Sequence, residues 1–238
     1  MSNTTPSLPG LTVFFPCYNE AQNIASTVAK AIPIIKQITP KYQVIVVNDG
    51  SKDNTSEVLA KLRQKYPFIE VINHPVNRGY GAAIKSGFYA AKYPWITFND
   101  GDGQFDFSDI TKFIETQQRT GADVVIGYYL GRQVSPLRII GSKIWELAVF
   151  LLFGLRVTDI DCGFKLISKK VVDTIPKLEA ERGPFISSEF LIKTKKAGFK
   201  IAEVGVRHYP RHAGAATGAQ LKVILSGLRD LLRLRSKL

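Results

Sequence analysis

The chain has few cysteines and few histidines for its 238 residues. Its two cysteines, Cys17 and Cys162, cannot provide a disulfide framework, and because both lie in apolar stretches we expect buried free thiols. Free thiols are typical of a reducing compartment. The three histidines, at positions 74, 208 and 212, show no Ser-His-Asp or Cys-His spacing. Nothing in this spacing indicates a catalytic nucleophile.

Long apolar runs are also missing. The longest candidate, 147–155, is about half of the roughly 18 residues that a membrane span needs. Residues 1–10 are polar and lack the apolar centre of a signal peptide. We therefore expect neither a signal peptide nor a transmembrane span.

The charge is strongly one-sided, because 32 Lys and Arg residues outnumber 20 Asp and Glu residues and leave a net charge of +12. A basic protein suits anionic partners such as nucleic acid, phosphorylated substrates or an acidic membrane surface. The basic residues are dispersed, and no helix-turn-helix, RNP-like aromatic motif or zinc-ligand spacing accompanies them. We therefore expect phosphorylated substrates and an anionic membrane surface as partners, and no nucleic acid.

Short β-rich runs alternate with helical patterns through the first half of the chain. Strands are predicted at 11–16, 42–47, 69–72, 95–98 and 123–126, with helices between them, the last capped by Ser108. Such alternation is typical of βαβ units that build a mainly parallel sheet flanked by helices. The length of the chain allows one substantial α/β core.

Polar loops follow these strands, at the edge where a parallel sheet binds its ligands. The loops are 18–20, 49–51, 77–79 and 100–102, and the last contains Asp100 and Asp102. Side chains at i and i+2 of an extended segment point to the same side, so both carboxylates can reach one cation. Carboxylates suit Mg²⁺ or Mn²⁺, which would neutralise a diphosphate. The alternative is an acidic, Gly-rich turn after a strand.

Two further helices are predicted in the second half. A helix is predicted over about 139–155, and its stretch 144–155 is apolar almost all round with basic flanks, so it is either a buried core helix or an interfacial helix in a lipid headgroup layer. The segment 218–238 has an apolar stripe and several basic residues, which suits either a membrane surface or packing on its own domain. We expect one domain over residues 1–217, followed by this basic amphipathic helix.

Four segments, in this order, resemble family 2 glycosyltransferases, which have the GT-A fold, a Rossmann-like α/β architecture. They are Phe15–Glu20, Val47–Thr55, Asn77–Ala83 and Asp100–Gln104. Within that family the chain is most similar to dolichol-phosphate mannose synthases and their bacterial relatives. The segments that carry this closer similarity are Asp102–Gln104, Leu152–Asp159 and Asp161–Lys165.

The resemblance implies roles for the matching residues. Residues that would bind the sugar nucleotide are Pro16, Tyr18, Asn19, Glu20, Asp49 and Asp100, with Arg211 on a loop that closes over the phosphates. Residues that would hold Mg²⁺ or Mn²⁺ are Asp100, Asp102 and Gln104. Arg132 and Arg138 would bind the phosphate of the acceptor, and Asp102 and Arg138 would take part in catalysis.

The resemblance implies that the protein would be a metal-dependent inverting transferase, bound peripherally at the cytoplasmic face of a membrane. It would move a hexose from GDP-mannose or UDP-glucose to a polyprenyl or dolichyl phosphate, an acceptor that is largely dianionic and needs no general base. The alternative is transfer to a hydroxyl of a glycan, lipid or protein, with Asp161 and Glu189 as candidate catalytic bases. Each also has a structural interpretation: Asp161 as a partner of a nearby Arg or backbone amide, and Glu189 as a favourable helix-start charge.

Overall fold

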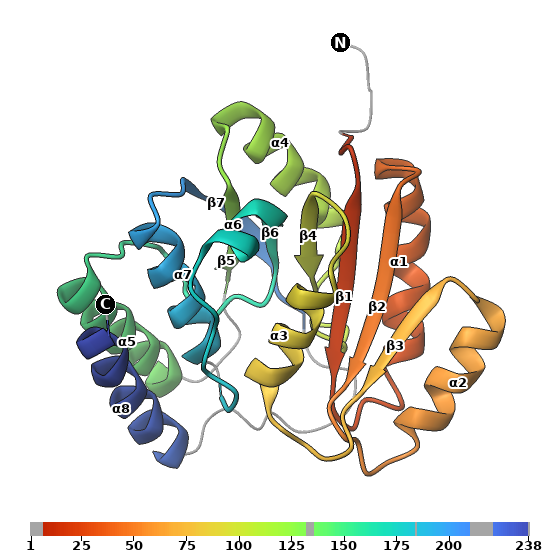
Figure 1. Cartoon of the computed structure of the whole chain (residues 1–238), viewed down its shortest axis with the longest axis horizontal. Coiled ribbons are helices and arrows are strands. Elements are labelled where there is room, and N and C mark those ends of the chain that lie inside the picture. The colour runs from red at the N-terminus through yellow and green to blue at the C-terminus, as the bar shows by residue number, and fades with distance from the viewer. Residues whose placement is uncertain (1–6, 132–135, 184, 210–220, 238) are drawn as a thin grey trace.

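The computed structural model describes residues 7–131, 136–183, 185–209 and 221–237, without the side chains of residues 136–138, 221–226 and 228. A seven-stranded sheet in the order β3-β2-β1-β4-β6-β5-β7 forms its centre (Figure 1). The strands are β1 (Leu11–Cys17), β2 (Tyr42–Asn48), β3 (Ile69–Asn73), β4 (Trp95–Phe98), β5 (Val124–Leu130), β6 (Lys165–Ser168) and β7 (Ile201–Arg207). Neighbouring strands are parallel, except that β6 is antiparallel to both β4 and β5.

Helices cover both faces of the sheet. One face packs against α1 (Ile24–Ile38), α2 (Thr55–Lys65) and α4 (Ile110–Thr120). The other packs against α3 (Tyr80–Ala90), α5 (Pro136–Phe153), α6 (Lys169–Thr174), α7 (Phe185–Lys196) and α8 (Leu221–Lys237). Because both faces are covered, β1 and β2 are almost entirely buried and have continuous apolar runs rather than an alternating pattern.

The direction of β6 brings two distant segments to one edge of the sheet. Strands β1 to β4 all end at this edge, and β6 begins there because it is antiparallel to β4. Phe98, the last residue of β4, pairs with Lys165, the first residue of β6. The loop before β6, which contains Asp161, therefore lies beside the loop after β4, which contains Asp100.

The helices and strands predicted for the first half are present, with small shifts at their ends. The predicted cap at Ser108 is wrong. The Asp106 side chain instead accepts from the backbone N–H of Ser108 at 2.9 Å and caps a 3₁₀ turn, η1 (Phe107–Asp109), so that α4 begins only at Ile110. The cap is therefore a carboxylate two residues earlier, which satisfies the backbone N–H of Ser108 itself.

The structure bears on the two helices whose environment the sequence left open, α5 and α8. One side of α5 is buried at Val149, whereas Ile144 and Leu151 on the other side are 64% and 71% exposed. α8 packs on the domain through the buried side chains of Leu231 and Leu234. Across the described ranges, no helix is both long enough and apolar enough to cross a bilayer.

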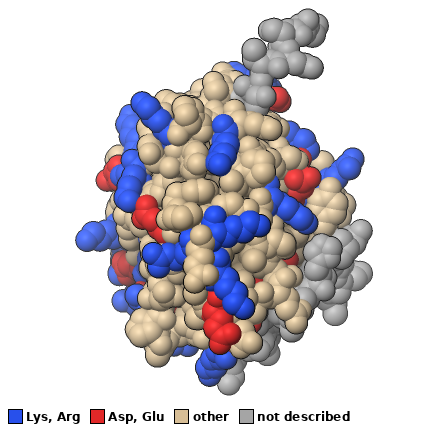
Figure 2. Space-filling view, turned by 90° about the vertical axis from the view of Figure 1, so that its right-hand side faces the viewer, with Lys and Arg blue, Asp and Glu red and all other residues tan. Residues whose placement is uncertain are grey.

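Two general predictions about side chains can also be compared with the structure. Cys17 and Cys162 are free and buried, as expected, and burial raises the pKa of each thiol to about 12. On the face that carries α2 and β3, Lys and Arg side chains are spread across the surface with Asp and Glu among them (Figure 2). The charge on this face is thus dispersed, as the sequence indicates.

Candidate active site

The two aspartates of the loop after β4 are held by different parts of the chain. The Tyr80 hydroxyl, at the start of α3, donates to Asp100 Oδ1 at 3.0 Å. On the other side of this carboxylate, a Cβ added to Gly163 would lie only 2.5 Å from Asp100 Oδ2. Asp102 is buried, and its Oδ1 accepts from the backbone N–H of Gln104 at 3.1 Å. Both carboxylates are therefore fixed in orientation by their surroundings.

Gln104 is directed toward the end of β7. Its side-chain amide donates to the carbonyl of Tyr209 at 3.2 Å, while its backbone supports Asp102. This contact links the loop after β4 to the segment that leads out of β7. A role for Gln104 as a metal ligand stays a prediction.

The aspartate pair suits a divalent ion that arrives with a phosphorylated substrate. Within the part of the chain that the structure describes, no three His, Cys, Asp or Glu side chains form a cluster able to hold a metal. Mg²⁺ sites commonly use one or two carboxylates and complete the coordination with substrate phosphates and water. Burial and then the nearby carboxylate of Asp100 raise the pKa of Tyr80 well above its ordinary value. The two residues fit Mg²⁺ or Mn²⁺ bound by a diphosphate.

A buried lysine supports the loop before β6. Lys165 is 1% exposed, and its Nζ donates to the carbonyls of Cys162 and Ile160. Burial lowers the pKa of Lys165, and the carboxylates of Asp159 and Asp161 counteract this effect. The ammonium group thus lies beneath the loop that carries Asp161 and that brings Gly163 against Asp100.

Hydrogen bonds join the loop after β1 to the loop after β2. Asn19 has φ of 55°, a left-handed conformation that Asn tolerates better than most residues. Its backbone N–H donates to Ser51 Oγ at 2.9 Å, and its side-chain oxygen accepts from Lys52 N at 2.8 Å. Glu20 is buried, and its backbone N–H donates to Thr55 Oγ1 at 3.0 Å. These two predicted nucleotide-binding residues thus hold the two loops together.

Pro16 connects the first loop to the aspartate loop. Pro16 is buried, and its carbonyl accepts from the backbone N–H of Gly101 at 3.2 Å. Tyr18, two residues later, is half-buried, and its role in nucleotide binding stays a prediction. The ends of β1, β2 and β4 therefore form one continuous rim.

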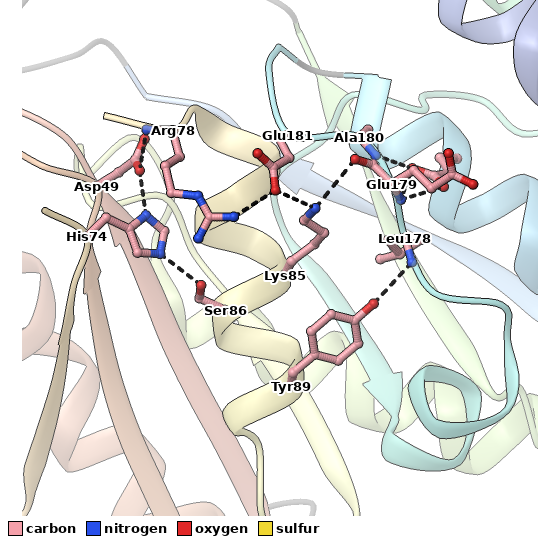
Figure 3. Close-up of polar contacts among 11 residues, drawn as sticks. Asp49, His74, Arg78, Lys85, Ser86, Tyr89, Leu178, Glu179, Ala180 and Glu181 are labelled. Carbon is pink, nitrogen blue, oxygen red and sulfur yellow. Dashed lines mark hydrogen bonds and ion pairs between the residues drawn. The ribbon is translucent and has the colours of Figure 1, made fainter. Parts of the chain in front are cut away.

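Asp49 is the centre of a hydrogen-bond network that the spacing of the sequence does not reveal. Its Oδ1 lies 2.6 Å from His74 Nδ1 and accepts from Arg78 N at 3.0 Å (Figure 3). Its Oδ2 accepts from Gly79 N at 2.7 Å. His74 Nε2 lies 2.9 Å from Ser86 Oγ. This Ser-His-Asp chain joins residues far apart in the sequence, and its Asp and His are buried. The arrangement is therefore a structural link between loops rather than an exposed nucleophile.

The two candidate bases occupy different surroundings. Glu189 is buried, and its carboxylate accepts from the backbone N–H groups of Glu179 and Ala180 and from Lys193 Nζ at 2.6 Å. These contacts indicate that Glu189 anchors residues 179–180. Asp161 is half-buried, and its backbone N–H donates to Asp159 Oδ1 at 2.9 Å. Asp161 belongs to the loop beside the aspartate loop, whereas Glu189 lies within α7.

The structure does not describe the side chains of the three arginines predicted to bind phosphate. Arg132 and Arg211 lie outside the described residues, and only the backbone of Arg138 is described, in the first turn of α5. Their roles stay predictions.

A hollow of about 350 Å³ lies between α2 and the ends of β2 and β3, and its lining includes neither Asp100 nor Asp102. Its wall includes Asn48, Asn73 and His74. Asn48 already donates to Ser56 and Asn73, and both ring nitrogens of His74 are engaged. Because these polar groups bond to one another rather than converge on the hollow, the rim at the strand ends is the better candidate site.

Two proteins similar in sequence to this chain have names that describe transfer to or from a polyprenyl phosphate. Dolichyl-phosphate beta-glucosyltransferase ALG5A of Trichomonas vaginalis is 29% identical over 214 residues, covering 84% of this chain and 66% of that protein. Undecaprenyl-phosphate 4-deoxy-4-formamido-L-arabinose transferase of Photorhabdus laumondii is 28% identical over 216 residues, covering 90% of this chain and 64% of that protein. The chain thus spans just under two thirds of the length of these relatives.

Solved structures agree with the fold. Glucosyl-3-phosphoglycerate synthase of Mycobacterium tuberculosis in complex with UDP superposes with a TM-score of 0.73 at 19% identity, covering 95% of this chain and 80% of that one. The same synthase with Mn²⁺, UDP and phosphoglyceric acid gives a TM-score of 0.68 at 19% identity, covering 94% and 76%. The fold of this chain is therefore GT-A-like, as expected. Since the family described as Glycosyl transferase family 2 matches residues 12–175, the chain belongs to that family.

Proposed function

We propose that the protein is a metal-dependent inverting glycosyltransferase that moves a hexose from a sugar nucleotide to a polyprenyl phosphate at a membrane surface. The observation that carries this proposal is the rim of strand ends, where Asp100 and Asp102 lie beside the loops after β1 and β2. Membership of the family supports transfer from a sugar nucleotide. The names of the relatives support a polyprenyl-phosphate acceptor.

On the donor side, Asp100 and Asp102 would hold Mg²⁺ or Mn²⁺ on the diphosphate. When bound, such an ion supplies Lewis-acid stabilisation of the charge that develops on the leaving group. The loops that carry Tyr18, Asn19 and Asp49 would hold the nucleoside, and Arg211 would close over the phosphates. The names of the relatives and the UDP-glucose bound by a solved synthase support UDP-glucose ahead of GDP-mannose.

On the acceptor side, a phosphate monoester attacks without a general base because its second pKa is about 6. It must be positioned by cations, which Arg132 and Arg138 would supply through paired hydrogen bonds. The buried Glu189 supports a reaction without a general base, because its carboxylate already accepts hydrogen bonds from Lys193 and two backbone N–H groups. Transfer would occur in a single displacement with inversion at the anomeric carbon.

The exposed side of α5 would rest against the bilayer. Ile140, Ile144, Leu147 and Leu151 recur along one side of this helix, and each is more than half exposed. α8 packs beside α5, and Figure 1 shows the two helices together at one end of the molecule. Arg138 lies in the first turn of the same helix. An acceptor phosphate at the membrane surface would therefore bind near it. This surface supports peripheral association, which we place at the cytoplasmic face.

Product analysis tests the proposal. Purified protein is incubated with Mn²⁺, labelled UDP-glucose or GDP-mannose, and either dolichyl phosphate or undecaprenyl phosphate. We expect label in an acid-labile glycolipid with inverted anomeric configuration. A parallel incubation offers hydroxyl acceptors, namely a glycan, a lipid and a protein, in place of the polyprenyl phosphate. Label transferred only to such a hydroxyl group would contradict the proposed acceptor and favour the alternative transferase. No transfer from any sugar nucleotide would contradict the donor as well.

A further inference from the structure

Three consecutive residues at the start of α3 contact both acidic loops of the rim. The backbone N–H groups of Arg78 and Gly79 donate to Asp49, at 3.0 and 2.7 Å. The next side chain, Tyr80, donates its hydroxyl to Asp100 Oδ1 at 3.0 Å. One short segment therefore binds a carboxylate of the loop after β2 and a carboxylate of the loop after β4.

This segment is itself fixed from the opposite side. A Cβ on Gly79 would lie 2.6 Å from the carbonyl oxygen of Glu181, and φ at Gly79 is 105°, a conformation that strongly favours glycine. Arg78 also pairs with the Glu181 carboxylate at 2.7 Å (Figure 3). Because residues 78–80 cannot shift freely, the two carboxylates that they hold cannot easily move apart.

Asp100 is confined at both oxygens. Oδ1 accepts from the Tyr80 hydroxyl, and Oδ2 lies against Gly163, where a Cβ would approach to 2.5 Å. The loop that carries Gly163 is held in turn by Lys165 through the carbonyls of Ile160 and Cys162. Rotation of the Asp100 carboxylate would break the hydrogen bond to Tyr80 or press against Gly163.

We propose that Tyr80 is a positioning residue for Asp100, and that residues 78–80 set the spacing between the nucleoside and diphosphate subsites. The inference rests on the proposed function, because it takes Asp100 as a metal ligand and Asp49 as part of the nucleoside subsite. A hydrogen bond from a neighbouring side chain fixes the orientation of a metal-ligating carboxylate, and its loss commonly costs 10- to 100-fold in metal affinity. Tyr80 performs this task from the helix whose start also holds Asp49.

The test is Mn²⁺ binding, measured by the loss of the free-ion signal in electron paramagnetic resonance as the protein is titrated in the presence of UDP. In Tyr80→Phe, which keeps the ring and removes the hydroxyl, we expect the Kd for Mn²⁺ to rise about tenfold or more. Binding of uridine alone should be unchanged, because Asp49 keeps its partners. The melting temperature of the metal-free protein should fall by no more than about 4 °C.

Tyr89→Phe is the matched control, since it removes a hydroxyl from the same helix, one that accepts from Leu178 N at 3.1 Å, away from the aspartates. It should leave the Kd for Mn²⁺ unchanged. Gly163→Ala provides a second variant if Tyr80→Phe does not fold. Its added methyl group would press against Asp100 Oδ2, the oxygen that Tyr80 does not contact. We expect this variant also to weaken Mn²⁺ binding, because the added methyl group would displace Asp100 Oδ2.

The outcomes separate the two proposals. A wild-type protein that binds UDP without Mn²⁺ dependence would contradict the proposed donor chemistry. A wild-type protein with Mn²⁺-dependent UDP binding and a Tyr80→Phe variant of equal Kd would overturn only the positioning role. A parallel loss of uridine binding would likewise show that the hydroxyl supports the whole rim rather than Asp100.

Discussion

The imidazole of His74 lies 2.6 Å from the carboxylate of Asp49 and joins the end of β3 to the loop after β2. Because an ionised carboxylate only accepts hydrogen bonds, the Nδ1 of His74 carries the proton. In the neutral ring, Nε2 then accepts from the Ser86 hydroxyl at 2.9 Å. The link is buried, so each group depends on its partner rather than on water.

Replacing His74 by alanine should destabilise the protein. The change leaves a buried carboxylate with fewer donors, which typically costs about 1–3 kcal/mol. Urea unfolding followed by circular dichroism measures the free energy of unfolding. Ser86→Ala is the matched control. It should lower the free energy of unfolding by less, because Ser86 contacts His74 Nε2 and not the charged Asp49 carboxylate. Equal stability of wild type and His74→Ala would show that Asp49 does not need this partner.

Replacing Asp102 by asparagine should sharply reduce turnover and weaken donor binding in Mn²⁺, because the amide removes the negative charge that attracts the cation. Steady-state kinetics and calorimetric titration of UDP measure the two effects. Asp106→Asn is the matched control in the same segment, and asparagine can keep the cap that Asp106 provides. Unchanged kinetics in Asp102→Asn would remove the metal from the mechanism.

Replacing Arg138 by alanine should raise the apparent KM for the lipid phosphate more than the KM for the donor. The guanidinium group would form paired hydrogen bonds with the phosphate monoester, and alanine removes them. The measurement is initial rates over a grid of both substrates, with the exposed Arg156→Ala as the control for net charge. Equal changes in both KM values would refute a role specific to the acceptor.

Replacing Ile144 and Leu151 together by glutamine should reduce sedimentation with anionic liposomes. Each exposed apolar side chain that enters the interface contributes to binding in proportion to its buried apolar area. Val76→Gln is the matched control, because Val76 is as exposed as Ile144, at 64%, but lies on the loop after β3. The melting temperature should not fall in either variant. Undiminished liposome binding of the double variant would place the membrane contact elsewhere.

Stability should depend on the ionisation of Glu181. Hydrogen bonds from Lys85 and then Arg78 lower the pKa of this carboxyl below its ordinary value of 4.5. A carboxyl with a lowered pKa in the folded state contributes stability above its ordinary pKa and loses it as the pH falls through the folded value. Glu181→Gln should therefore be less stable than wild type at pH 7, by about 0.5 kcal/mol because the pair is partly exposed and screened.

The difference between the two proteins should shrink as the pH falls below about 4.5, when the wild-type carboxyl becomes protonated. Thermal unfolding from pH 7 to pH 3 measures it. Glu115→Gln, an exposed helix residue with no described ion pair, should show no comparable pH dependence. A constant difference across this range would mean that the ion pairs of Glu181 do not contribute to stability.

The sheet of the first half was predictable because its strands are apolar, short and separated by Gly, Asp and Asn. The strands β6 and β7 were not predicted. β6 has four residues and begins with the buried Lys165, a residue type that normally argues against a core strand. β7 contains Glu203 and Gly205, which interrupt its apolar pattern. In both cases the sheet supplies the pairing that the local sequence does not specify.

The candidate site was predictable only in part. An Asp-x-Asp pair directly after an apolar strand is visible in the sequence, so the sequence alone indicates these two residues. The structure places Gly101 and Asp102 in a turn, however, so the expected extended geometry is wrong. The contacts that orient them come from Tyr80 and Gly163, which are distant in the chain and reach Asp100 only through the order of the strands. No local pattern identifies such partners.

The position of β6 also has a consequence for synthesis on the ribosome. Strands β1 to β4 can pair as soon as they emerge, since each neighbour is already present. β5 emerges next but finds no place beside β4, because that place belongs to a strand about forty residues later. Until β6 emerges, the edge of β4 in the nascent chain is unpaired and prone to aggregation. Chaperones would protect the chain during this interval.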